Sequence, residues 1–457
     1  MTVKAPMPVR TLNLVAPLPH KGTAMRTTDT AASVQAWSGA VSPLIGTSLR
    51  RGDVDSANER STPATTPGTR TSTTATRTTS TRTTKRWSAP SADSSFSFSA
   101  LVQAYLDCRK SKRNTASALV FEERLESNLC NLYDELASGE YRPGRTICFV
   151  ITRPKPREVW AAEFRDRIVH HLVYNHVAGR FIAGFVAGSS ACIPGRGTLY
   201  AAKRLEAAVR SVTQNWARPA FYLKCDLANF FVAIDKNVLH DQLTVKIPEL
   251  WWLWLTDTIL FHDPRENVEL RGRAELLAKV PPHKSLFNAP ADTGLPIGNL
   301  SSQFFANVYL NALDQFCKHQ LGARHYVRYV DDFILLNESP QWLNDAHDRI
   351  RDFLPARLGA RLNPTKTVLQ PVDRGIDFVG HVIRPWRRTT RPRTLHNGIQ
   401  RLRYMPAGDL FEAGNSYLGL VRQASHSHRE QAEIANVLRK RGHAVKGDLT
   451  KIYRAQA

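Results

Sequence analysis

Two adjacent aspartates lie in the middle of an apolar, strand-like run, and this pattern constrains the fold more than any other part of the sequence. The run extends from Tyr326 to Leu336, with Asp331 and Asp332 at its centre. The apolar and aromatic residues on both sides predict a β-hairpin with the two acids at its turn. Neighbouring carboxylates repel each other, so placing both at an apolar tip is costly unless a cation compensates them. The Asp-Asp dipeptide alone is a weak signal, because it is also common in ordinary turns.

A further aspartate segment precedes this run in the chain. In the stretch Phe221–Phe231, Asp226 ends an apolar strand and is followed by two aromatic residues. Nucleotidyl transfer requires two Mg²⁺ ions roughly 4 Å apart, one that activates the attacking 3′-oxygen and one that holds the triphosphate. Because Mg²⁺ prefers hard oxygen ligands and takes few carboxylates per site, three aspartates from two adjacent strands can supply such a site. In this interpretation Asp226 bridges both ions, Asp331 completes the pair and Asp332 helps to position them.

A glycine- and proline-rich segment lies between the two aspartate segments. It runs from Gly294 to Gln303 and leads into a helical run through Phe304 and Tyr309. A loop of this kind at the start of a helix lets the backbone approach a base or a phosphate closely. The alternative is an ordinary helix start with Ser301 as its N-cap.

The charge of the chain favours a polyanionic partner. Sixty-two Lys and Arg residues against 40 Asp and Glu residues leave a formal net charge of +22. Nucleic acid is the commonest partner of so large a surplus, and a basic surface that only aids solubility is the alternative. Six scattered cysteines with no CxxC pair, and no signal peptide, predict a reduced cytoplasmic protein. The most apolar window, Trp251–Leu255, is too short to span a bilayer, so we expect a core or docking helix and no membrane partner.

Composition divides the chain into a tail, residues 1–94, and an ordered remainder. Thr71–Thr84 is almost entirely Thr, Ser and Arg, and such a segment has too little apolar surface to offset its ordering entropy, so we expect disorder. A dispensable extension, an RNA-gripping basic tail and a targeting segment are the open alternatives for its role. Beyond the tail, helical periodicity over residues 98–140 and 160–183 and strand-like alternation from Phe221 predict an α+β fold. Helices on one side of a small antiparallel sheet would suit this order.

Taken in order, these segments resemble the motifs of reverse transcriptases. The matching blocks are two fingers blocks at Pro154–Glu158 and Arg165–Arg167, motif A at Asp226–Phe231, motif B at Gly294–Gln303, motif C at Tyr329–Asp332, motif D at Asn363–Thr367, and motif E, the primer grip, at Gly375–His381. The resemblance implies a right-hand polymerase fold with fingers at residues 95–220, a palm at 221–385, and a helical thumb with a C-terminal tail at 386–457. It implies that dNTPs are added to a DNA or RNA primer on an RNA template, with two Mg²⁺ ions as cofactors.

Within the family, the residues of the motifs are most similar to those in the reverse transcriptases of diversity-generating retroelements. Ile297–Gln303 replaces the Gln-Gly form of motif B that is common in retroviral and group II intron enzymes, and Asn415–Gly419 in the thumb matches the same group. This resemblance implies an error-prone enzyme with adenine-directed misincorporation and a small accessory protein as a further partner. Retron-like and phage-defence reverse transcriptases share parts of these motifs and are the nearest alternative. A non-catalytic RNA-binding scaffold is a distant one, and three mutually repelling acids argue against it.

Family positions also imply the metal and nucleotide sites. The metal set is Asp226, Leu227, Asp331 and Asp332, and the nucleotide set is Lys155, Arg157, Phe231, Ile297 and Gly298. Phe231 lies where the family keeps an aromatic that blocks a ribose 2′-hydroxyl; its alternative is core packing, which suits Phe230 better. Ile297 replaces a glutamine of many relatives, so selection of the incoming nucleotide should be looser. Lys155 and Arg157 are expected to grip the triphosphate, and a solvated basic loop is their alternative.

The remaining candidates are weaker single residues. Lys366 is a candidate general acid for the leaving pyrophosphate, and Arg196, Gln303 and Gly380 are candidates for template and primer contacts, although the loop at Arg196 can be an ordinary turn. Asp235 is expected to cap or buttress motif A rather than bind metal.

Two further groups complete the set. Four histidines lack Cys or Glu partners at zinc spacing and are expected to be structural or surface residues: His170, His171, His426 and His428. The basic run over residues 384–393 is expected to lie against nucleic-acid phosphates.

Overall fold

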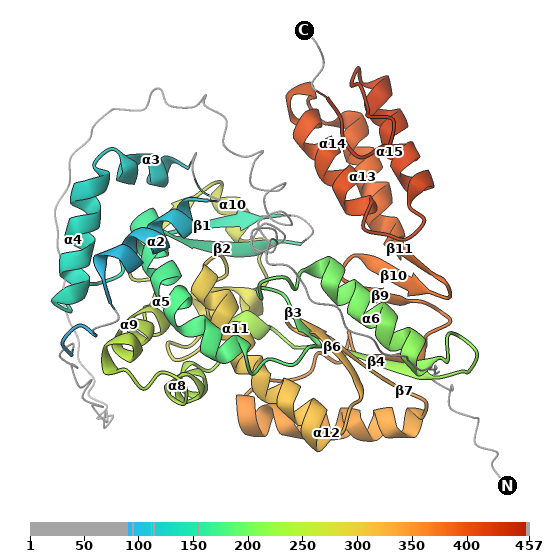
Figure 1. Ribbon diagram of the computed structural model, residues 1–457, viewed down its shortest axis with the longest axis horizontal. Helices are drawn as coiled ribbons and strands as arrows, with labels where there is room; N and C mark the ends of the chain where they lie inside the picture. Colours follow the sequence, from blue (N-terminus) through green and yellow to red (C-terminus); the bar gives the residue numbers. More distant parts are fainter. Residues whose placement is uncertain (1–89, 94–95, 111, 113–114, 153–154, 454–457) are drawn as a thin grey trace, which may run out of the picture.

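The structure is a computed structural model that describes residues 90–93, 96–110, 112, 115–152 and 155–453 (Figure 1). Nearly all of the predicted disordered tail, residues 1–94, lies outside the described residues. The described chain combines helices with three small sheets, so the predicted α+β class is confirmed. No helix in these ranges is long and apolar enough to cross a membrane.

A five-stranded sheet lies at the centre of the molecule. Its order is β3-β6-β7-β4-β8, with β3 at Ser189–Ser190, β6 at His325–Tyr329, β7 at Asp332–Asn337, β4 at Phe221–Asp226 and β8 at Val368–Pro371. Neighbouring strands are antiparallel, as predicted, except that the two-residue β3 pairs with β6 in parallel. The predicted hairpin around the two aspartates is β6–β7.

Helices cover both faces of this sheet, which differs from the predicted one-sided arrangement. Successive side chains on a strand point to opposite faces. On β7, Phe333 packs into the main core with α12 (Pro340–Leu358), whereas Ile334 packs into a second cluster with α6 (Thr198–Val212), on the opposite side of the sheet (Figure 1). A strand with one solvated face alternates between apolar and polar residues. Both faces of β7 are covered, so its apolar run is unbroken.

Helices and a second sheet form the N-terminal part. The helices are α2 (Phe98–Arg109), α3 (Ala116–Glu122), α4 (Leu125–Ala137) and α5 (Phe164–Ile182). The sheet has the order β2-β1-β5, with β1 at Thr146–Ile151, β2 at Arg157–Ala162 and β5 at Val268–Arg271. The helix predicted from residue 160 begins at Phe164, because residues 157–162 pair with β1 as a hairpin. β5 pairs in parallel with β1, so the chain returns here after leaving the segment predicted as fingers.

The segment between β4 and the helix after motif B contains several short helices in addition to β5. It contains α7 (Phe230–Ala233), α8 (Lys236–Thr244), α9 (Leu250–Leu260), α10 (Ala274–Leu277) and 3₁₀ turns at Pro282–Lys284 and Leu286–Asn288. The next helix is α11 (Leu300–Gln315), which continues into a π-helical turn at Phe316–Gln320. Trp251 and Trp252 of α9 are buried in the main core, so the apolar window is a core helix.

The C-terminal part has a core of its own. A three-stranded antiparallel sheet joins β9 (Ile376–Phe378), β10 (His381–Arg384) and β11 (Arg387–Thr390). Three helices follow, α13 (Pro392–Tyr404), α14 (Ala407–Val421) and α15 (His428–Lys440), and their apolar faces pack on one another (Figure 1). The palm–thumb boundary predicted after residue 385 lies inside the β10–β11 hairpin, because β11 continues the sheet before the helices begin.

Candidate active site

The three predicted aspartates meet at one edge of the central sheet. Asp226 is the last residue of β4 and Asp332 is the first residue of β7, and the two are Cα partners in the antiparallel register. Asp331 lies in the turn between β6 and β7. Strand pairing therefore brings together carboxylates that are far apart in the sequence.

Two lysines neutralise part of this acidic cluster. Lys366 Nζ lies 2.6 Å from Asp226 Oδ2, and Lys224 Nζ lies 2.9 Å from Asp332 Oδ2. Asn363 adds two bonds to Asp226: its side-chain amide donates to Oδ1 at 3.3 Å, and its backbone N–H donates to the carbonyl at 2.8 Å. The positions of two of the three carboxylates are thus fixed by cations of the chain itself.

Burial and mutual repulsion raise the pKa of two of the carboxyl groups. The pKa of Asp331 is raised by burial and then by the charge of Asp226, against nearby cations that include Arg157. Burial raises the pKa of Asp332 to about 6, against the opposing effect of Lys224. The negative charge of the cluster therefore carries a cost that further cations would reduce.

The donor set fits a hard divalent cation. Asp332 Oδ1 is buried and has no hydrogen-bond partner among the described residues, and carboxylate oxygens are ligands that Mg²⁺ prefers. The side chain of Leu227 is apolar and buried, so only its backbone carbonyl can serve in the predicted metal set. Across the described ranges, no three His, Cys, Asp or Glu side chains are already gathered as a metal cluster. The two lysines contact one oxygen each, Asp226 Oδ2 and Asp332 Oδ2, so a cation would share the carboxylates with them or displace them.

Hydrogen bonds fasten the Gly/Pro loop to strand β2. The backbone N–H of Trp160 donates to the carbonyl of Ile297 at 2.7 Å, and the backbone N–H of Ala162 donates to Asn299 Oδ1 at 3.1 Å. Gly298 has a φ of 137°, and a Cβ at this position would lie 2.6 Å from the carbonyl oxygen of Trp160. Only glycine permits this approach. The loop is therefore held in place through its backbone, while the side chain of Ile297 is half-buried.

Ser301 does not cap the helix that follows this loop. The N-cap position of α11 is Asn299, and the Ser301 hydroxyl instead lies 2.9 Å from Nδ1 of the buried His170 on α5. Burial lowers the pKa of His170 to about 3 and that of its neighbour His171 to about 4. Both histidines are therefore neutral at physiological pH, as structural residues are expected to be.

The two aromatics of motif A have different surroundings. Phe230 is 4% exposed and belongs to the main core, whereas Phe231 is half-buried and packs against the edge of that core. The carbonyl of Phe231 accepts a hydrogen bond from the backbone N–H of Leu295 at 2.8 Å, which places Phe231 beside the Gly/Pro loop. Asp235 is the N-cap of α8, and its side chain accepts from two backbone N–H groups of the first turn, as predicted.

Both predicted fingers cations are exposed. Arg157 is the first residue of β2, and its charge opposes the rise in the pKa of Asp331. Lys155 lies in the connection between β1 and β2. Exposed cations on this hairpin are free to meet a charged ligand at the sheet edge.

The predicted template and primer residues are engaged elsewhere. Arg196 donates to the carbonyls of Val186 at 2.9 Å and Ser189 at 3.3 Å, and so braces its own loop. Gln303 Oε1 accepts from a cysteine thiol at 3.1 Å. Gly380 forms the turn between β9 and β10 with a φ of 87°. Their roles toward nucleic acid stay predictions.

The basic run after the primer grip does not act as one surface. Arg388 is buried, donates to the carbonyl of Gln423 at 2.8 Å and pairs with Glu206, so the prediction of phosphate contact is wrong for this residue. Arg391 pairs with Asp377 but stays partly exposed.

Three residues next to the aspartates are missing from the predicted set. Lys224 could have been predicted, because a residue two positions before Asp226 points to the same face of the strand. Asn363 belongs to the block that resembles motif D, but its bonds to motif A have no sequence signal. Arg328 looks like an ordinary polar strand residue, although it is fully buried.

The chain is similar to known proteins. A sequence model of the family described as reverse transcriptase (RNA-dependent DNA polymerase) matches residues 156–383, which include all three aspartates. Protein YkfC of Escherichia coli (strain K12) is 24% identical over 296 residues, covering 57% of this chain and 72% of YkfC. Telomerase from Candida albicans, solved with the TWJ fragment of telomeric RNA, aligns at 12% identity over 70% of this chain, with a TM-score of 0.37. The chain spans 60% of the length of that telomerase.

Proposed function

Since the chain belongs to the reverse transcriptase family and is an RNA-directed DNA polymerase, we propose that it adds dNTPs to a primer 3′-end by two-metal catalysis on Asp226, Asp331 and Asp332. The observation that carries the proposal is the register of the sheet, which pairs Asp226 with Asp332 and leaves Asp331 in the adjoining turn. Two Mg²⁺ ions bound there would activate the attacking 3′-oxygen and neutralise the triphosphate.

The lysines have a role in this proposal. The two lysines screen the repulsion among the carboxylates. Lys366 holds Asp226 at the sheet edge, and Lys224 holds Asp332 there. A metal ion would compete with the two ammonium groups for Asp226 Oδ2 and Asp332 Oδ2. A Lys366 released from Asp226 would be available to donate a proton to the leaving pyrophosphate.

The nucleotide would lie between the aspartates and the fingers hairpin. Arg157 and Lys155 are exposed on that hairpin and supply positive charge for the triphosphate. Gly298 keeps the Gly/Pro loop against β2 beside this space, and Phe231 occupies the space that a ribose 2′-hydroxyl would need. Partial burial of Phe231 beside the Gly/Pro loop supports this role.

Substitution of the aspartates tests the proposal. We expect Asp226→Asn and Asp331→Asn each to lower primer extension by about three orders of magnitude, because several kcal/mol of charge stabilisation is lost. RNA affinity should persist, since phosphate contacts elsewhere supply most of it. The matched control is Asp235→Asn, because asparagine also caps helices well and this residue is outside the site. Near-normal extension by either of the first two variants would contradict the assignment.

We further propose that the chain is the error-prone enzyme of a diversity-generating retroelement and that it works with a small accessory protein. The motif wording around Ile297 supports this, because an apolar side chain gives only a weak grip on the templating pair. Loss of one polar contact is worth on the order of 1–3 kcal/mol of discrimination. A retron-like or phage-defence enzyme would use the same site with another template.

Sequencing of DNA copied from a defined RNA separates these two functions. The wild-type enzyme should make most of its errors at template adenines, and Ile297→Gln should reduce them. Errors that are rare, or spread evenly over the four bases, would favour the retron-like or defence enzyme and leave the catalytic proposal standing.

A further inference from the structure

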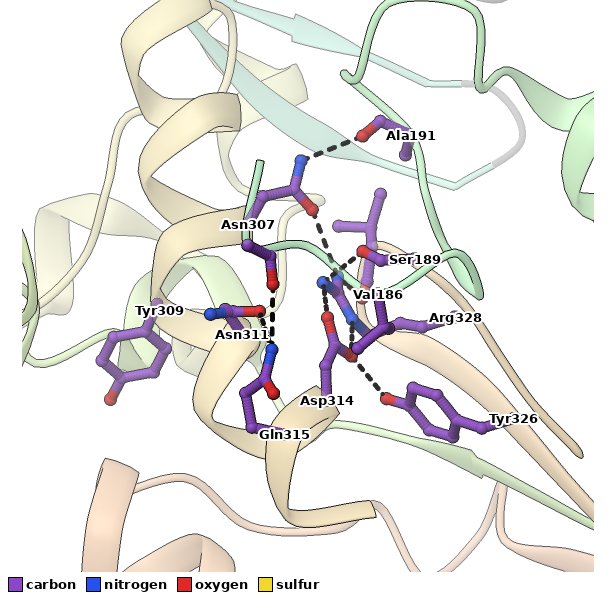
Figure 2. A network of polar contacts seen from close by, with 12 residues as sticks. Val186, Ser189, Ala191, Asn307, Tyr309, Asn311, Asp314, Gln315, Tyr326 and Arg328 are labelled. Atoms are coloured by element: carbon purple, nitrogen blue, oxygen red, sulfur yellow. Dashed lines mark hydrogen bonds and ion pairs between the residues drawn. The ribbon is translucent and has the colours of Figure 1, made fainter. Parts of the chain in front are cut away.

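An arginine is buried beside the catalytic hairpin with no exposed atoms. Arg328 lies on β6, and its side chain and that of Asp314 on α11 are both 0% exposed. Figure 2 shows the guanidinium at the centre of a polar network that joins α11, Ser189 of β3 and the hairpin. A buried ion pair is often no more stable than apolar residues of the same volume, so its position needs a reason other than stability.

Every donor of this guanidinium has a partner. Nε donates to Asp314 Oδ1 at 2.7 Å, and Nη2 donates to Asp314 Oδ2 and to Ser189 Oγ, both at 2.7 Å. Nη1 donates to Asn307 Oδ1 at 3.2 Å and to the backbone carbonyl of Val330 at 2.9 Å. These bonds use all five N–H groups of an arginine, and a lysine has only three. The network is therefore specific for arginine.

The bond to Val330 reaches the residue before Asp331. Val330 has a φ of 55°, in the left-handed region that a β-branched residue rarely adopts. Such a residue persists only where its surroundings hold it. The guanidinium supplies that hold, because it fixes the carbonyl between Val330 and Asp331 from the buried side of the turn.

We propose that Arg328 is a positioning residue that holds the Val330 turn and thereby fixes Asp331 against Asp226. The inference rests on the proposed catalytic role of Asp331. Through Asp314 and Asn307 the same guanidinium ties the turn to α11, the helix that begins after the Gly/Pro loop. One buried guanidinium thus holds both the turn that carries Asp331 and the helix that follows the Gly/Pro loop.

A charge-conserving substitution tests this inference. Arg328→Lys keeps a cation opposite Asp314, but its three donors cannot replace the five bonds that the guanidinium makes. We expect kcat for primer extension to fall about 10- to 100-fold, as for displacements of catalytic groups by about 1 Å, with little change in KM for dNTP or in RNA affinity. The control is Tyr326→Phe, which removes a 2.7 Å bond to Asp314 from the same network and leaves every Arg328 donor in place. It should lower stability without lowering kcat.

Two readouts separate positioning from mere stability. Adding Val330→Gly to Arg328→Lys should recover part of kcat, because glycine adopts a positive φ without a hold. Amide hydrogen exchange of the peptide over residues 326–336 should be faster in Arg328→Lys than in Tyr326→Phe. If Arg328→Lys does not fold, the Arg328→Met/Asp314→Leu/Tyr326→Phe variant removes the buried charges together, and the same loss of kcat is expected relative to Tyr326→Phe.

The outcomes also separate this inference from the catalytic proposal. Loss of activity in Asp331→Asn together with a kcat for the Arg328 variants within about twofold of the control would overturn the positioning role alone. Failure of Val330→Gly to raise kcat would do the same. Full activity in Asp331→Asn would instead overturn the catalytic assignment, whatever the Arg328 variants show.

Discussion

At the residue scale, specific neighbours neutralise two of the three carboxylates in the acidic cluster. Asp226 and Asp332 each contact one lysine, and Asp331 is left with burial and repulsion that raise its pKa. Lys224 also donates to the carbonyl of Asp377 on β9 at 2.9 Å, so β9 and Asp332 contact the same ammonium group.

We expect sugar selection to depend on one side chain, Phe231. We expect Phe231→Ala to raise ribonucleotide incorporation relative to deoxyribonucleotide incorporation, because the space beside the sugar opens. Phe231 is half-buried, so the substitution should cost less stability than at a core position. Competition between labelled rNTP and dNTP on one primer measures the ratio. The control is Phe230→Leu, in the core, which should lower stability without changing sugar choice. An unchanged ratio in Phe231→Ala would assign Phe231 to core packing.

At the element scale, local pattern was sufficient for some parts of the fold and insufficient for others. The β6–β7 hairpin and β4 were predictable, since apolar alternation and a turn dipeptide are local signals. The parallel pairing of β5 with β1 was not, because nothing near Val268–Arg271 indicates a partner so far away. The same limit hid Arg328, whose burial depends on Asp314 from another element. Site residues were predictable where the motif itself bears the chemistry, and their supporting contacts were not.

Helix α5 should make the fold sensitive to acid. His170 and His171 have folded pKa values of about 3 and about 4, below the ordinary 6.5, because burial disfavours their charged forms. The unfolded chain binds more protons below pH 6.5, so stability is complete above that pH and is lost as pH falls toward the folded values. The expected loss at pH 5 is roughly 2 kcal/mol for each histidine.

Urea unfolding at pH 7.5 and pH 5 measures this effect. His170→Gln should reduce the difference in unfolding free energy between the two pH values, while His396→Gln, at an exposed position on α13, should leave it unchanged. An equal pH response in wild type and His170→Gln would show that His170 does not contribute to acid sensitivity.

At the scale of the whole molecule, the N-terminal helices and the central sheet share one core. The main cluster runs from Phe96 through α5, α9 and α11 to α12, whereas the three C-terminal helices have a separate cluster. Phe96 begins the main cluster: its ring stacks on Tyr133 at 4.9 Å and on Trp251 at 4.4 Å between centroids, and it is 6% exposed. We therefore expect the removal of the Phe96 side chain to destabilise the fold.

The contributions of residues 1–89 and of Phe96 to stability can be compared directly. A chain shortened to begin at Pro90 should keep the thermal transition and the primer-extension activity of the full chain, because the Thr/Ser/Arg-rich segment has little apolar surface to contribute. The same shortened chain with Phe96→Ala should lose about 3–5 kcal/mol, the usual cost of truncating a buried aromatic. Calorimetry and primer extension on the three proteins decide the matter. A loss of stability on shortening alone would mean that residues 1–89 contribute to the fold, and a loss of activity at unchanged stability would favour the RNA-gripping tail over the dispensable extension.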